Sequence, residues 1–162
     1  MTTKDFLLKL HTRTHKSFEG LLKHCRKFSE EQINREMDGF GIPTIRLSLH
    51  HMIEAEKYWV GVIEGRIDVD ENADEFPTIE SLEKYRAQVF ELTHNHIKNS
   101  TDEQLDTARK MMTWQNKEYD LAPVHIITRT QTHIYQHQGQ VLAICRLFGE
   151  PCSGLDYPIK QD

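Results

Sequence analysis

The sequence has 162 residues, of which 38% are hydrophobic and 28% charged, and its formal net charge at pH 7 is -5. No apolar run approaches the roughly 20 residues that a membrane-spanning helix needs, and the negative net charge disfavours a nucleic-acid-binding surface. The chain length predicts one single domain over residues 1–162. The first residues lead directly into an amphipathic pattern and lack the apolar centre of a secretory signal, so we expect a cytoplasmic protein.

The first predicted element is a long helix from about residue 3 to 28, because apolar residues recur there at intervals of three and four. Ser29 and Gln32 have the spacing of a capping box, which predicts a short helix over residues 30–37. Glycines then follow from Gly39 onward and predict that the chain reverses.

A second long helix is predicted over residues 45–63. Pro43 suits the first turn of a helix, and Gly65 provides a natural stop. Residues 68–77 are acidic and have no periodic apolar pattern, so we expect an exposed connection there.

Two further long helices are predicted, one over residues 79–98 with Thr78 as its N-cap and one over residues 120–148, closed by Gly149. Between them, residues 106–119 have no clear helical periodicity and predict an irregular or partly extended crossover. Four long amphipathic helices with polar connections predict an all-α fold, a four-helix bundle with a long irregular crossover before the last helix.

The chain contains two HxxxH pairs, His11 with His15 and His133 with His137. With ten histidines in the sequence, such pairs arise by chance, so the spacing alone identifies no site. His11 and His15 lie near Phe18 on the apolar face of the first helix, and we interpret them as the edge of that helix's core face.

The second pair is a stronger candidate for a metal site, because residues four apart on a helix differ in direction by only about 40° and two imidazoles can share one ion. His133 and His137 lie on a largely apolar face, where polar groups need partners. In the second long helix, His51 shares its face with apolar residues whereas the adjacent His50 does not, so His51 is the predicted third ligand. The alternative is that all three are histidines at the core edge, hydrogen-bonded to carbonyls or to each other.

Two segments, HMIEAEKYW at residues 51–59 and HIYQHQGQ at residues 133–140, resemble the signature segments of the DinB/YfiT-like superfamily. The stretch over residues 15–52 also resembles the N-terminal half of that family. The resemblance implies a four-helix bundle, a homodimer and a divalent metal bound by His51, His133 and His137. Gln138 occupies a position where the family's motif usually has arginine, which removes a permanent charge.

Other residues of these segments have predicted roles around the three histidines. Gln140 is expected to hydrogen-bond one of the ligands. Tyr58 and Trp59 are expected to form core and pocket wall, and Glu54 is expected to be a solvated carboxylate. Gly139 is interpreted as a point of close approach between helices.

Three neutral nitrogen ligands leave a position on the ion for water or substrate, as in catalytic sites. Zinc or nickel suits imidazole ligands best, with iron, cobalt or copper as further candidates. The resemblance implies a metal-dependent transferase that uses a low-molecular-weight thiol as cosubstrate and acts on an unknown small molecule. The same centre could equally support hydrolysis by a metal-bound water. The alternative to an enzyme is a non-catalytic, metal-binding, stress-related bundle protein.

Overall fold

The computed structural model describes residues 1–67 and 72–158, and the chain is mostly helical with one small two-stranded sheet. None of the helices in this described part is long and apolar enough to cross a membrane. The elements in chain order are α1 (Thr3–Cys25), α2 (Glu30–Asn34), α3 (Ile45–Ile63), the 3-10 helix η1 (Ala73–Glu75), α4 (Ile79–Asn99), α5 (Asp102–Asp106), β1 (Arg109–Met112), β2 (Glu118–Leu121) and α6 (Pro123–Leu147).

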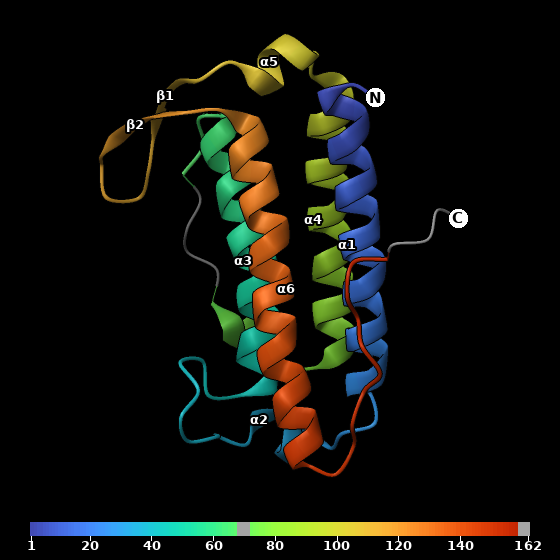
Figure 1. The fold of residues 1–162 in the computed structure, drawn as a ribbon. Helices are drawn as coiled ribbons and strands as arrows, with labels where there is room; N and C mark the ends of the chain where they lie inside the picture. The colour runs from blue at the N-terminus through green and yellow to red at the C-terminus, as the bar shows by residue number, and fades with distance from the viewer. Residues whose placement is uncertain (68–71, 159–162) are drawn as a thin grey trace.

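The four long helices, α1, α3, α4 and α6, lie side by side (Figure 1). Helices α1 and α3 each pack against both α4 and α6. At one end of the helices lie α5 and the β1–β2 hairpin, together with the N-terminus, and α2 lies at the opposite end (Figure 1).

Side-chain caps determine where most of the helices begin. The hydroxyls of Thr2, Ser29, Thr78 and Thr101 each accept a hydrogen bond from the backbone N–H three residues later, and the side chain of that residue returns a bond to the cap. Helix α6 has no side-chain cap and begins instead at Pro123, whose missing N–H needs no partner in the first turn. These signals are local, so they could be identified from the sequence.

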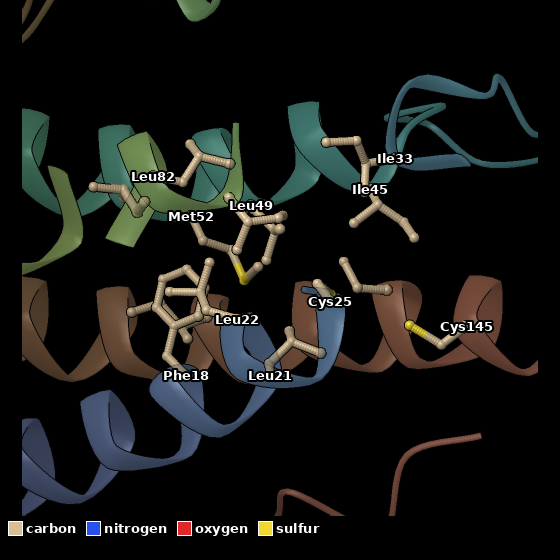
Figure 2. Close-up of a cluster of buried hydrophobic side chains, with 14 of the residues drawn as sticks. Phe18, Leu21, Leu22, Cys25, Ile33, Ile45, Leu49, Met52, Leu82 and Cys145 are labelled. Atoms are coloured by element: carbon tan, nitrogen blue, oxygen red, sulfur yellow. The ribbon is translucent and has the colours of Figure 1, made fainter. Parts of the chain in front are cut away.

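The apolar core has two parts. The larger cluster fills the half of the helices nearer α2 (Figure 2) and includes Phe18, Leu22, Leu49, Met52 and Leu82. The smaller cluster lies toward the hairpin and includes Leu7, Val62, Ile97, Leu105 and Ile127.

A buried polar layer separates the two apolar clusters. Along each long helix, buried polar residues lie between the residues that belong to the larger cluster and those that belong to the smaller one. They are His11 and His15 on α1, Glu56 on α3, Thr93 on α4 and Gln131 on α6. Buried polar groups need hydrogen-bond partners, and the layer provides them only in part. Both histidines are paired with Glu56, whereas Oγ1 of Thr93 and Oε1 of Gln131 have no partner among the described residues.

The prediction for residues 45–63 is confirmed at both ends, and the third long helix ends one residue later than predicted. The first helix ends at Cys25, because residues 26–28 form a turn, and α2 stops at Asn34 rather than at residue 37. Of the predicted connection over residues 68–77, residues 68–71 lie outside the described residues, and the remainder contains η1.

The only strands in the described part of the chain lie in the crossover before α6, which the sequence predicted to be irregular or partly extended. The crossover contains an antiparallel hairpin in which Arg109 pairs with Leu121 and Met112 with Glu118. Asn116, in the connecting turn, has a φ of 52°, a left-handed conformation that asparagine tolerates. The same pairing explains why α6 begins at Pro123 and not at residue 120.

Candidate metal centre

The structure brings the three predicted ligands together on two adjacent helices, His51 on α3 and His133 and His137 on α6. The ring centroid of His51 lies 5.0 Å from that of His133 and 4.9 Å from that of His137, and the latter two are 4.4 Å apart. One nitrogen from each ring lies within 4.8 Å of the others, so the group could hold a metal ion.

Hydrogen bonding orients the lone pairs of this group. The Nδ1–H of His137 donates to Oε1 of Gln140 at 2.7 Å, which leaves the lone pair of His137 on Nε2. That Nε2 lies 3.1 Å from Nε2 of His133, a separation at which both nitrogens could reach one ion at roughly 2.0–2.1 Å. Gln140 therefore contacts a candidate ligand.

The surroundings favour the uncharged form of these imidazoles. Burial, followed by the neighbouring His137, lowers the pKa of His51 below its usual value. Burial is also the main cause that lowers the pKa of His133 to about 4, and His137, His51 and Arg129 lower it further. Neutral imidazole is the form that binds metal ions, so both rings are available as ligands at neutral pH.

A cavity of about 410 Å³ opens beside the histidines, and it is lined by His51, Glu54, Ala55, Tyr58, Trp59, Trp114, Arg129 and His133. A larger surface hollow, of about 680 Å³, has Glu64, His96 and Arg109 in its lining and contains none of the three histidines. The cavity next to the candidate ligands is therefore the one that a substrate of this site would use.

The β1–β2 hairpin supplies one wall of this cavity. The backbone N–H of Trp114 donates to Oη of Tyr58 at 2.9 Å and so ties the hairpin to α3. The guanidinium carbon of Arg129 lies 5.2 Å from the centroid of the Trp59 ring. Tyr58 and Trp59 line the cavity as predicted, whereas no sequence pattern indicated that Trp114 and Arg129 lie there.

The prediction that Glu54 is a solvated carboxylate is wrong. Its side chain is only 31% exposed and lines the cavity, where burial raises its pKa above the usual value. Glu54 is thus a cavity carboxyl and not a freely solvated one, because the hairpin and α6 cover part of this face of α3.

His51 lies beside the other two candidate ligands and is half-buried, and its role as a ligand stays a prediction, whereas the prediction that His50 lies on a polar face is wrong. His50 is 3% exposed, and its ring lies 5.4 Å from that of Phe76 and 5.8 Å from that of Tyr85. The residues that cover it come from α4 and the segment before it, so the face of α3 that looked polar in the sequence is also buried.

A second group with metal-ligand chemistry lies in the buried polar layer. Nε2 of His11 and Nε2 of His15 each lie 2.8 Å from a different oxygen of Glu56, and all three residues are buried. The interpretation of His11 and His15 as the edge of the core is therefore wrong, because both lie inside it. Their partner Glu56 was not predicted, because it lies on another helix, 41 and 45 positions away in the chain.

The histidines of this buried group differ from the three candidate metal ligands because their ring protons are donated to a carboxylate. Arg86 can only donate, so its contact of 3.1 Å to Nδ1 of His15 leaves the proton of that ring on Nε2, where it is donated to Glu56. Burial would raise the pKa of Glu56, but His15 and His11 outweigh it and hold that pKa well below its usual range. Burial lowers the pKa of His11 despite its bond to Glu56. The group is thus a hydrogen-bonded network that joins α1, α3 and α4.

Gln138 does not line the cavity. It is 1% exposed and faces α1, where Oγ of Ser17 lies 3.3 Å from its Oε1 and donates to the carbonyl of Leu155 at 2.6 Å. In this chain the position that usually carries arginine in the resembled motif therefore belongs to the contact between α1, α6 and the C-terminal segment.

Comparison with known proteins agrees with this architecture. The model of the DinB family matches residues 1–162. Among solved structures, the chain is similar to a crystal structure described as the conserved protein of locus from Enterococcus faecalis, with a TM-score of 0.66 and 15% sequence identity over 91% of this chain and 97% of that chain. At this identity the likeness concerns the fold alone. No curated protein matches the chain.

Proposed function

This chain belongs to the DinB family, and we propose that it is a divalent-metal-dependent enzyme with a four-helix bundle of the DinB type and with His51, His133 and His137 as the metal ligands. The observation that carries the proposal is the convergence of three ring nitrogens from α3 and α6 within 4.8 Å, beside a cavity of about 410 Å³. Catalytic metal sites typically combine three protein ligands with an open position.

The donor set is three imidazoles without a carboxylate, which suits zinc or nickel, and also iron, cobalt or copper. A divalent ion held by neutral ligands would keep its full charge, which stabilises the thiolate of a low-molecular-weight thiol or activates water for hydrolysis. A thiol-dependent transferase and a metal-water hydrolase are the two reaction types that we propose for this centre.

The chain's own side chains would orient and assist the reaction. Gln140 holds His137 in the tautomer that presents Nε2 to the centre. Glu54 lines the same cavity with a pKa raised by burial, so it is our candidate for receiving a proton there. Trp59 and Trp114 form flat walls that would limit the approach of water.

The test begins with metal content. Protein purified without chelator should contain close to one equivalent of divalent metal by elemental analysis, and His133→Ala and His137→Ala should abolish it. His125→Ala is a matched control, because His125 lies exposed on the same helix, and it should retain the metal. Unchanged metal in the two ligand variants would contradict the proposal.

Activity assays then separate the reaction types. Thiol transfer to a chromogenic electrophile and hydrolysis of an activated ester should be measured on the metal-loaded protein. Metal bound without exchangeable water and without either activity would instead support the alternative, a non-catalytic, metal-binding, stress-related protein. The homodimer and the assignment of residues 1–162 to one domain stay predictions, and light scattering in solution tests the dimer.

A further inference from the structure

One positively charged side chain, Arg129, lines the cavity beside the three histidines. Arg129 lies on α6 one helical turn before His133. Within the described part of the chain its guanidinium forms no ion pair with a carboxylate, and its charge is in contact with the Trp59 ring at 5.2 Å. A guanidinium that lies on an aromatic face keeps its planar set of donors available for a carboxylate.

The rest of the lining is mostly flat and aromatic. Tyr58, Trp59 and Trp114 face the cavity, and the last two are the only tryptophans in the sequence. Such walls favour a planar or apolar body over a strongly hydrated one. The volume of about 410 Å³ suits a small molecule.

Resting on the proposed function, we propose that the substrate class of this site is a small carboxylate with an aromatic or otherwise flat apolar body, whose carboxylate is held by Arg129. A carboxylate and a phosphate could both accept hydrogen bonds from the guanidinium. Glu54 lines the same cavity and, when ionised, would repel the second negative charge of a phosphate monoester. These two side chains together favour a singly charged anion, and the titrations with and without zinc separate their effect from that of the ion's own charge.

The intrinsic fluorescence of the protein can report on this cavity, because both tryptophans line it. The probes are phenylacetate, its uncharged analogue phenylacetamide, and phenyl phosphate, each titrated into metal-free and into zinc-loaded protein, with calorimetry as a second readout. We expect phenylacetate to bind about tenfold or more tighter than the other two, as a charge-assisted hydrogen bond implies.

Variants assign the preference to one residue. Arg129→Gln should remove the preference for the acid, and Arg129→Lys should restore part of it. Arg146→Gln, at an exposed position on the same helix, should leave the preference unchanged. Circular dichroism confirms that each variant is folded, which is expected because Arg129 is also exposed.

Equal affinity for acid and amide, absence of binding of the acid, or a preference that persists in Arg129→Gln would overturn the inference. Tighter binding of phenyl phosphate than of phenylacetate would overturn the choice of a carboxylate. Metal content is measured on the same samples. Protein that holds metal but shows no Arg129-dependent preference contradicts this inference alone, whereas protein that selects the acid through Arg129 without holding metal contradicts the proposed function alone.

Discussion

The Nδ1–H of His137 donates to the side-chain oxygen of Gln140 at 2.7 Å, one helical turn further along α6. This bond turns Nε2 of His137 toward His133, so the orientation of a candidate metal ligand depends on a residue that does not itself reach the centre.

Replacing Gln140 with leucine should therefore weaken metal binding without removing a ligand. We expect a loss of about 10–100-fold in affinity, the usual effect of removing a partner that orients a ligand. Competition with a chromogenic chelator measures it. Gln140→Glu, which keeps an acceptor, should lose less, and Gln136→Leu on the exposed side of the same helix should have no effect. Equal affinities in all four proteins would show that the hydrogen bond plays no part in binding.

The depressed pKa of His133 predicts a pH-dependent stability of the metal-free protein. The unfolded chain takes up this proton near the ordinary pKa of 6.5, whereas the folded protein takes it up only near pH 4. The contribution is therefore fully present above about pH 6.5 and is lost as the pH falls toward 4. Urea denaturation at a series of pH values should show a shallower decline in His133→Gln than in wild type, with a difference of about 1–3 kcal/mol across this window. Parallel curves for the two proteins would contradict this explanation.

Glu56 should be a strong determinant of stability. Its carboxylate accepts hydrogen bonds from His11 and His15 inside the core, so Glu56→Ala leaves buried donors without partners and should cost about 3–5 kcal/mol of unfolding free energy. Glu56→Gln, which keeps one acceptor, should cost less. Glu91→Ala, at an exposed position, serves as the control and should change stability little.

The same carboxylate has its own pH dependence. Because its pKa is held below the usual value of 4.5, its contribution is present above about pH 4.5 and is lost as the pH falls below that value. The difference in unfolding free energy between the wild type and Glu56→Gln should thus shrink as the pH falls below about 4.5. A constant difference down to pH 3 would show that Glu56 does not titrate in this way.

The buried network should not bind metal, since its histidine protons are already donated to Glu56. His15→Gln should therefore leave the metal content at the wild-type value, measured per folded protein by elemental analysis. His51→Ala is the contrasting variant and should lose the metal. Loss of metal in His15→Gln, with the fold retained, would show that the buried network binds the ion and would contradict this prediction.

The hairpin wall depends on the bond from the Trp114 backbone N–H to Tyr58. Tyr58→Phe removes the acceptor, which should cost about 1 kcal/mol or less of global stability while exposing the turn. Hydrogen–deuterium exchange over residues 113–117 should become faster. Tyr119→Phe, at an exposed hairpin position, is the control. Equally fast exchange in both variants would show that the bond to Tyr58 does not protect the turn.

The long helices and the three histidines were accessible from the sequence. Apolar spacing and the caps at Ser29 and Thr78 involve residues within four positions of one another, so they act wherever the segment folds. Glycines closed the helices at Gly65 and Gly149, whose positive φ angles of 74° and 80° suit a residue without Cβ.

Only the tertiary structure decided which polar groups are paired and what surrounds the site. His50 is buried because α4 and the segment before it cover a face of α3 that looked polar, and Glu56 becomes a core residue because α1 presents two imidazoles to it. The hairpin required pairing across a turn, and Trp114 reaches Tyr58 across 56 positions of chain. Helical periodicity is a local property, whereas burial and strand pairing depend on partners that are distant in the sequence and adjacent only after folding.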